Sequence, residues 1–314
     1  MNNDKVYDKA EEMAEKVLCT GDKCVCPKIK EAGLCSGCDV FMALRDYYAE
    51  EEIKSFALSD WQEIKEILDS GKAKEVFEVG DEREETLITG EKITLVLLGF
   101  GQDEKVSGGK ANMTIGLKDL MDGDFEMNLE HKNAGGWDKS RMRTVYMERI
   151  FKLLPEDLRE LIVPVKKCTS AGNGSTDITV SEDKLFLFSL AEIYSTRAIK
   201  KSDNGDISQN ADVYQEEGEQ YEYFKNLLGD ADPYDDNEET IKRKANGGGS
   251  AYDWWLRSPY IGSTSIFRCV GSGGGVFGNA AGDPGRRLLR LLRVILTLNI
   301  ARLVWRAVFL HTDV

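Results

Sequence analysis

The sequence predicts an α+β protein, because helical and strand-like segments both occur along it without an internal repeat. The composition suits a folded chain of this class: 41% of the residues are hydrophobic and 31% are charged, as is typical of globular proteins. The 314 residues are enough for one large domain or two ordinary ones. We expect three parts: a helical N-terminal region with a cysteine cluster (1–58), a main domain (59–285) and an atypical basic, apolar tail (286–314).

The first expected elements are helices. Near the N-terminus, apolar residues recur at helical spacing, at Val6, Ala10, Met13 and Val17. A cysteine-rich loop follows, and further helices are expected at about 40–50 and 59–70. The second of these has Asp60 near its start and Gly71 at its end, which is the usual chemistry of helix boundaries.

Strands and an amphipathic helix follow in the main domain. Residues 75–80 suggest a short extended piece, and Lys92–Phe100 (KITLVLLGF) is apolar enough for a strand buried on both faces. Gly135-Gly136-Trp137 leads into a helix, whose apolar residues are Met142, Val145, Tyr146, Ile150 and Phe151.

The next segments predict another short helix, two strands and an insertion. Pro155 opens the helix, and strands are expected at 163–169 and 184–188. Residues 201–239 contain 13 Asp or Glu against two Lys, so we expect a long acidic insertion at the surface.

An aromatic strand is expected after the insertion. Gly247–Pro259 (GGGSAYDWWLRSP) begins with glycines and continues as this strand, in which Trp254 and Trp255 face opposite sides. Arg257 shares the face of Trp255, where it could close a buried carboxylate pair or make a cation–π contact.

The charge and hydropathy of the chain disfavour several classes of protein. With 55 Asp and Glu against 41 Lys and Arg, the formal net charge is −14, which disfavours nucleic acid as a partner. No stretch near the length of a membrane span lacks charges, so a spanning helix is not expected. The first twenty residues show no signal peptide. We therefore expect synthesis in the cytosol, with a virion or the cell surface reachable by another route.

Five cysteines are clustered near the N-terminus: Cys19, Cys24, Cys26, Cys35 and Cys38. In a reducing compartment such a cluster favours metal binding over disulfides. The CxxC pair at Cys35 and Cys38 can reach one tetrahedral ion, and Cys24 with Cys26 could supply the other pair of thiolates. A structural zinc is therefore predicted, with reduced surface thiols or an oxidised or iron–sulfur state as alternatives. The distant Cys168 and Cys269 are expected to be buried apolar residues in strands.

Motifs for catalysis and calcium are weak. His131 and His311 are the two histidines, and neither has a partner at metalloprotease spacing. A Ser–His–Asp or Cys–His site stays open, since its members need only meet in space, but His131 is expected to be a surface or capping residue. The acidic segment 230–239 lacks the glycine and the terminal Glu of an EF-hand, so a solvated loop is favoured over a calcium site.

Three phrases together resemble one family. They are GGWDKSRMRTVYMERIFKLLPEDLRELIVPVKKCTSAG (135–172), SEDKLFLFSLAEIY (181–194) and DWWLRSP (253–259). Over roughly residues 60–285 the chain is similar to the WWLRSP-type domain of unknown function common in gut bacteria and their phages. That resemblance implies a C-type-lectin-like fold of the formylglycine-generating enzyme superfamily. It also implies a variable protein of a diversity-generating retroelement, in which the segment after the WWLRSP strand is rewritten to change ligand specificity.

The segment after Pro259 has the composition of a binding surface. It places aromatic residues among Ser, Gly and Asn, which supply rigid anchors amid adaptable hydrogen-bonding groups. The candidate ligand-binding residues are Tyr260, Ser263, Thr264, Ser265, Phe267, Arg268, Ser272, Phe277, Asn279 and Asp283. The alternative is a glycine-rich surface hairpin with no partner.

The tail does not fit the rest of the chain. Residues 286–310 hold six Arg and no acid, and as one helix their polar residues would change sides near Leu298. The resemblance implies a short final strand here instead. Two accounts compete: a reading-frame shift near Arg286, or a cationic segment that docks to a partner or an anionic surface. Either way, we expect residues 286–314 not to complete the core sheet, because unpaired guanidiniums are costly to bury.

The function that the resemblance implies is ligand or receptor binding, in a phage or prophage, by a rigid scaffold without covalent chemistry. The expected partner is an unknown protein or glycan, with phage structural proteins also open. The alternatives are an enzyme of the formylglycine-generating type and a structural phage or cell-surface component. The enzymatic members use a pair of cysteines near the C-terminal end of the fold, where this chain has Cys269 alone, so catalysis is disfavoured.

Overall fold

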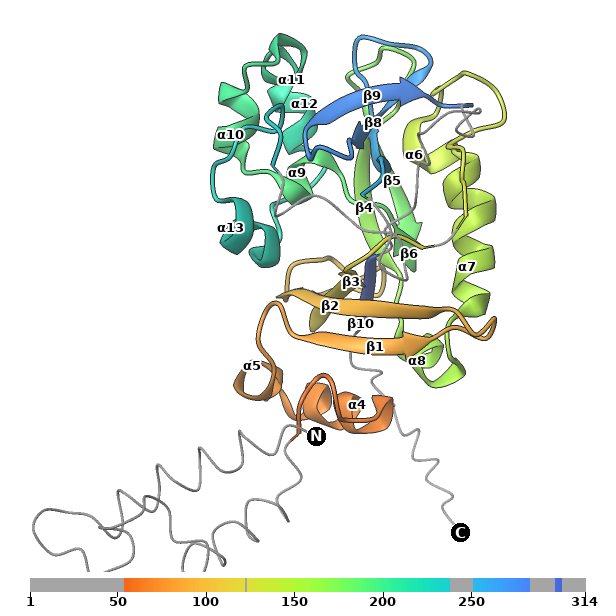
Figure 1. Ribbon diagram of the computed structural model, residues 1–314, viewed down its shortest axis with the longest axis vertical. Helices are drawn as coiled ribbons and strands as arrows, with labels where there is room; N and C mark the ends of the chain where they lie inside the picture. The colour runs from red at the N-terminus through yellow and green to blue at the C-terminus, as the bar shows by residue number, and fades with distance from the viewer. Residues whose placement is uncertain (1–53, 122, 238–250, 283–296, 301–314) are drawn as a thin grey trace, which may run out of the picture. The chain divides into compact units, whose positions relative to one another are not determined.

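The computed structural model describes residues 54–121, 123–237 and 251–282, and the backbone of 297–300 (Figure 1). The expected α+β class is confirmed, since helices accompany antiparallel sheets. The chain divides into two compact units, Met1–Leu58 and Ser59–Val314, and the account below concerns the second. The predicted N-terminal helices and all five clustered cysteines lie outside the described residues.

The helices of the described chain are short. They are α4 (Trp61–Ser70), α5 (Ala73–Val76), α6 (Gly136–Lys139), the π-helical turn η1 (Met142–Met147), α7 (Glu148–Leu153), α8 (Glu156–Leu161), α9 (Leu190–Ile193), α10 (Thr196–Lys201), α11 (Gly205–Gln209), α12 (Ala211–Gln215) and α13 (Glu222–Leu228). In Figure 1, α6 and α7 lie on one side of the long β4–β5 ribbon, and α10–α13 lie on the other.

The strands form three antiparallel sheets. They are β1 (Glu82–Thr86), β2 (Lys92–Phe100), β3 (Met113–Leu117), β4 (Val165–Ser170), β5 (Ile178–Asp183), β6 (Leu185–Phe186), β7 (Trp254–Pro259), β8 (Ile266–Val270), β9 (Val276–Ala280) and β10 (Thr297–Ile300). The first sheet has the order β1-β2-β3-β10-β6, the second pairs β4 with β5, and the third has the order β7-β8-β9. The third sheet carries the predicted binding segment.

Helix α4 shows how local sequence sets a boundary. The Asp60 carboxylate accepts a hydrogen bond from the Glu63 amide at 2.8 Å, and the Glu63 carboxylate accepts one from the Asp60 amide at 2.9 Å. This capping box satisfies two amides that the first turn leaves free. At the other end Gly71 adopts φ 77°, a left-handed conformation that favours glycine. The predicted helix at 59–70 is therefore confirmed, together with both of its boundary residues.

The core centres on the strand that the sequence predicted most strongly. Strand β2 has the predicted bounds, and Leu95, Val96, Leu97 and Leu98 are fully buried in it. Two other segments differ from prediction. Glu75 and Val76, the first residues of the extended piece expected at 75–80, belong to the helical turn α5, and strand β5 was not anticipated.

The acidic segment 201–239 is helical in its described part, and some of its side chains are buried, which the acidic composition did not indicate. It folds into α11, α12 and α13, whose apolar residues Ile207, Tyr214 and Phe224 are all fully buried. The prediction considered only the number of acidic residues. It did not consider the spacing of the apolar residues, which indicates helices with one buried face.

The tail also differs from prediction. The expectation that residues 286–314 do not complete the core sheet is wrong, because the backbone of Thr297–Ile300 forms β10 between β3 and β6. The arginines are unevenly distributed along the tail, and Val294–Ile300 contains no charged residue. From Thr297 to Ile300 polar and apolar residues alternate, which is compatible with a strand. The frame-shift account predicted that no such strand would form, so β10 contradicts it. The rest of the tail lies outside the described residues.

Candidate functional site

Strand β7, the WWLRSP strand, is buried along its whole length. Trp254 and Trp255 are each fully buried, and the Trp255 indole N–H donates to the carbonyl of Phe125 at 2.7 Å. Two large buried rings on successive residues anchor the strand in the packing on both of its sides.

Arg257 ties β7 to helix α9 and to the chain after α12. Its guanidinium is fully buried, forms an ion pair with the Glu192 carboxylate, and donates to the carbonyl of Glu217 at 2.6 Å. It also donates to the Leu187 carbonyl at 2.8 Å. Burial lowers the pKa of Arg257, but Glu192 outweighs that effect and the net pKa is raised. The buried carboxylate pair expected for Arg257 is confirmed.

Lys167 adds a second buried cation on the other side of Glu192. Its ammonium donates to Glu192 Oε1 at 2.7 Å and to the Tyr221 hydroxyl at 3.0 Å, and it pairs with the Asp103 carboxylate. Burial raises the pKa of Asp103, but Lys167 outweighs it and the net pKa is lowered, so Asp103 stays ionised. Residues Asp103, Lys167, Glu192, Glu217, Tyr221 and Arg257 are called the buried ionic network below.

Glu217 is the member of this network without a cation of its own. Its carboxyl bonds the Ser258 hydroxyl and accepts from the Ser170 amide at 3.1 Å. Burial raises its pKa to about 7. Two carboxylates, Asp103 and Glu192, are thus paired with two cations, Lys167 and Arg257, while Glu217 can hold a proton near neutral pH.

The buried ionic network serves to hold the scaffold together. Its ionised members are satisfied by one another and by backbone groups, as buried charges require. It joins β4, α9, the chain after α12 and β7, which are far apart in the sequence. A cavity of about 190 Å³ reaches it beside Lys167 and Glu217. Sequence reasoning missed all of its members except Arg257, because no local pattern links them.

The predicted binding residues separate into exposed and buried groups. Thr264 and Ser272 are exposed, and the following are half-buried: Tyr260, Ser263, Ser265, Phe277 and Asn279. Phe267 and Arg268 are corrections, because they are 0% and 1% exposed and present no surface to a ligand. Both residues belong to strand β8, and both of their side chains are packed inside the protein. Asp283 lies outside the described residues.

Arg268 makes buried contacts that fix the start of the segment after Pro259. Its guanidinium pairs with the Asp206 carboxylate, donates to the Tyr214 hydroxyl at 3.0 Å, and stacks 4.0 Å from the Tyr260 ring centre. Burial lowers the pKa of Arg268 to about 10, which still leaves it charged at neutral pH. Tyr260 is thus fixed over a cation at the start of the loop 260–265.

Asn133, which sequence reasoning did not single out, joins three loops. Its side-chain amide donates to the carbonyls of Ser263 and Ile266 at 2.9 and 2.8 Å, and its oxygen accepts from the Asn173 amide at 2.7 Å. Its backbone amide donates to Thr264 O at 2.9 Å. Asn133 is fully buried, but its burial could not be predicted from the sequence, because most Asn residues lie at the surface.

The loop 128–133 therefore lies against the predicted binding segment. The Asn128 amide donates to Ala281 O at 2.8 Å, and the backbone of Glu130 closely approaches Gly282. This loop exposes Leu129, 70% of whose surface is accessible, and His131, as expected for that histidine. We call residues 128–132, 260–265 and Asn279 together the loop face.

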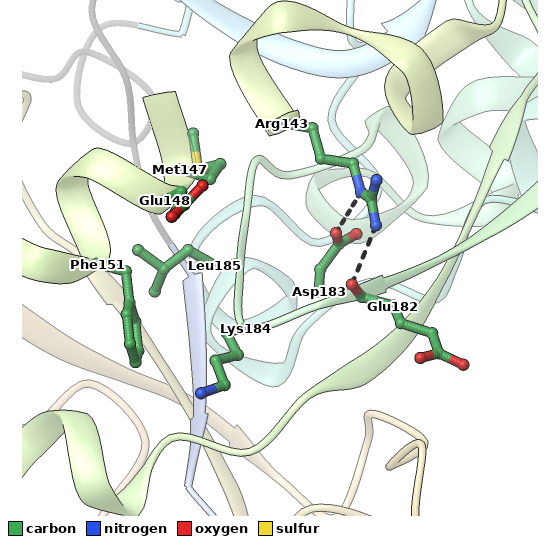
Figure 2. A pocket seen from close by; sticks show the side chains of 8 residues that line it. All are labelled: Arg143, Met147, Glu148, Phe151, Glu182, Asp183, Lys184 and Leu185. Atoms are coloured by element: carbon green, nitrogen blue, oxygen red, sulfur yellow. Dashed lines mark hydrogen bonds and ion pairs between the residues drawn. The ribbon is translucent and has the colours of Figure 1, made fainter. Parts of the chain in front are cut away.

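A separate groove of about 420 Å³ lies between η1–α7 and the β5–β6 turn. It is lined by Arg143, Met147, Glu148, Phe151, Glu182, Asp183, Lys184 and Leu185. Figure 2 shows the apolar side chains gathered on one side and the Arg143–Asp183 pair on the other. Neither the groove nor the π-helical turn was expected from the sequence.

The described residues hold no evident metal site. In residues 54–121, 123–237 and 251–282, no group of three His, Cys, Asp or Glu side chains is placed to hold an ion. Asp232, in the acidic segment considered for calcium, accepts from the Ser202 hydroxyl at 2.6 Å and the Asp203 amide at 2.7 Å. Cys269 is buried as expected, whereas Cys168 is partly exposed.

The fold and the WWLRSP strand define an α+β domain built around a buried charged scaffold. The family described as "Domain of unknown function (DUF6273)" matches residues 111–300, so the chain belongs to that family. The match runs through β10, which places that strand in the family's domain. No curated protein and no solved structure matches the chain. None of the helices in the described residues has the length and apolar character needed to cross a membrane.

Proposed function

We propose that this protein is a binding module that recognises a protein or a glycan through the loop face, without covalent chemistry. The observation that carries the proposal is the contrast between the loop face and its support. Thr264 is exposed and its neighbours Ser263 and Ser265 are half-buried, while strand β7, which precedes this loop, contains the fully buried Trp254, Trp255 and Arg257.

Rigid support matters because ordering a loop on binding costs free energy. Immobilising one side chain costs roughly 0.5–1.5 kcal/mol, so a loop already held in place binds more tightly. Asn133 secures the backbone of the loop 260–265 at Ser263, Thr264 and Ile266. Side chains on this loop can therefore change without loss of the fold, which is what a changeable binding surface needs.

The chemistry of the loop face favours recognition by hydrogen bonds around a few larger groups. Ser263, Thr264 and Ser265 offer hydroxyls, and Tyr260 and Leu129 add apolar area. This combination of adaptable polar groups and anchors is typical of paratopes. The finer parts of the proposal come from the resemblance: a C-type-lectin-like fold, a variable protein of a diversity-generating retroelement, and a phage or prophage origin. A virion or cell-surface location and phage structural partners belong to the same proposal.

The test uses the full chain on a glycan array and on a panel of purified bacterial surface proteins. Bulky charged groups on the loop face, in the variant Leu129→Arg/Thr264→Arg, should abolish any binding that the parent shows. Thr89→Arg is the matched control, because Thr89 is exposed in the turn between β1 and β2, in another sheet. All variants should keep the parent's melting temperature. Binding by the double variant equal to that of the parent would overturn the proposal.

A further inference from the structure

We propose that the groove between η1–α7 and the β5–β6 turn binds a small monocarboxylate with an apolar body. The inference does not rest on the proposed function, because the groove belongs to other elements than the loop face. Its volume of about 420 Å³ falls in the range of small-molecule pockets.

The floor of the groove is apolar. Met147 and Leu185 are 4% and 3% exposed, and Phe151 is half-buried beside them (Figure 2). An apolar ligand body placed over these three side chains would remove their remaining surface from water, which is the main source of affinity in such pockets.

One wall is a closed polar network that needs no ligand. The Arg143 guanidinium donates to Asp183 Oδ1 at 2.5 Å and to the carbonyl of Glu182 at 3.1 Å. Asp183 also accepts from the Trp137 indole at 2.9 Å and from the Ser181 hydroxyl at 2.6 Å. This wall gives the groove a fixed shape, because its two charges are already neutralised by each other.

Lys184 is the cation at the groove that has no counterion among the described residues. Its ammonium lies 4.6 Å from the centre of the Phe151 ring, on the apolar side of the groove (Figure 2). Among the described residues, no carboxylate lies within ion-pair distance of it. Glu148 is paired with Lys152 at 2.8 Å, and the Glu182 carboxylate points away from the apolar side chains. A ligand carboxylate at Lys184 would complete this pair next to the apolar floor.

The surrounding charges limit the ligand to one negative charge. Glu182 also lines the groove, and among the described residues its carboxylate has no ion pair, so a phosphate or dicarboxylate would meet its repulsion with Lys184 alone to offset it. A cationic ligand would meet Lys184, which already covers the Phe151 ring. A monocarboxylate with an aliphatic or aromatic body fits both conditions.

The π-helical turn is an independent sign of a site. Met142–Met147 widens the helix directly before α7, and it contributes Arg143 and Met147 to the groove. Such turns are rare and occur often at functional sites, because the wider turn displaces side chains that a regular helix would keep in line.

The test is a titration of the full chain with 4-phenylbutyrate, 4-phenylbutanamide and 4-phenylbutylamine, followed by NMR and calorimetry. We expect the carboxylate to bind with a dissociation constant on the order of 1 mM, as suits so small a ligand. The amide and the amine should bind roughly tenfold more weakly or not at all. Lys184→Gln should weaken carboxylate binding by about the same factor. Lys225→Gln, at an exposed position on α13 away from the groove, should leave it unchanged.

Three outcomes would overturn the inference: no saturable binding of the carboxylate, equal binding of the amide, or equal binding by Lys184→Gln. A preference for the amine would assign the groove to cations instead. Each variant's melting temperature shows that it is folded. The loop-face variant Leu129→Arg/Thr264→Arg should bind 4-phenylbutyrate like the parent, so that failure here and failure of the proposed function are distinguishable.

Discussion

Arg257 and Glu192 form a fully buried ion pair that joins the WWLRSP strand to helix α9. Arg257 and Glu192 are 65 positions apart in the sequence. The pair thus closes a long loop of chain, including α10–α13, against the base of the loop face.

The first prediction concerns this pair. Arg257→Met should destabilise the fold by roughly 3–5 kcal/mol, because it leaves the Glu192 charge buried with only Lys167 to offset it. The free energy of unfolding in urea measures the effect. Glu148→Gln, which breaks the exposed pair with Lys152, is the control and should leave the unfolding midpoint unchanged. Equal midpoints for both variants would show that the buried pair does not hold β7 in place.

The second prediction concerns pH. The pKa of Glu217 is about 7 in the folded protein, against an ordinary value of 4.5 for the same side chain in an unfolded chain. Because the folded pKa is the higher one, its stabilising contribution is fully present below pH 4.5 and is lost as pH rises toward 7. The loss amounts to about 3 kcal/mol at most.

Glu217→Gln removes this titration while keeping the shape of the side chain. Its amide can donate to the Ser258 oxygen, and its carbonyl can accept from the Ser170 amide. The variant should gain stability relative to the parent as pH rises from 5 to about 8. Urea unfolding at several pH values measures the difference between the two proteins. Parallel profiles would mean that Glu217 does not hold a proton in the fold.

How much the sequence predicts depends on whether the signal is local. The capping residues Asp60 and Gly71 and the apolar run Lys92–Phe100 act on their own segments, and the structure has those elements where the sequence predicts them. Arg257 could be assigned to a buried pair because a strand's alternation places it beside Trp255. Its partner Glu192 could not be identified, because only the tertiary fold brings the two together.

The errors have the same physical origin. Phe267 and Arg268 were assigned to a binding surface by composition, but a residue's exposure in β8 depends on what packs over it. Averaging charge over the tail concealed Val294–Ile300, which contains β10. Averaging acids over 201–239 likewise concealed the buried Tyr214 and Phe224.

The third prediction concerns Asn133. Asn133→Ala removes two donors and one acceptor from buried backbone groups, so it should cost roughly 1–3 kcal/mol of stability. It should also speed amide hydrogen exchange in the loops 260–265 and 171–175. Asn226→Ala is the matched control, because Asn226 is exposed on α13. Unchanged exchange in both loops would show that Asn133 does not order the loop face.

The fourth prediction concerns the N-terminal cysteines. They lie outside the described residues, so the prediction depends on the spacing of Cys19, Cys24, Cys26, Cys35 and Cys38. We expect the full chain, purified under reducing conditions, to carry about one zinc ion, held by four of these thiolates. Elemental analysis measures the content. Cys35→Ser/Cys38→Ser should lose the metal, whereas Cys168→Ser, in strand β4, should retain it.

Removal of the zinc should affect the N-terminal region more than the rest of the chain. Thiolate ligands must be deprotonated to bind, and the free energy of zinc binding contributes to the folding of the segment that supplies them. Limited proteolysis should therefore cut within residues 1–58 after chelation, while the unit 59–314 stays resistant. Chelated and metal-loaded chains with the same proteolysis pattern, or a chain that binds no zinc, would contradict a structural zinc site. Retention of zinc by Cys35→Ser/Cys38→Ser would assign the ion to other ligands.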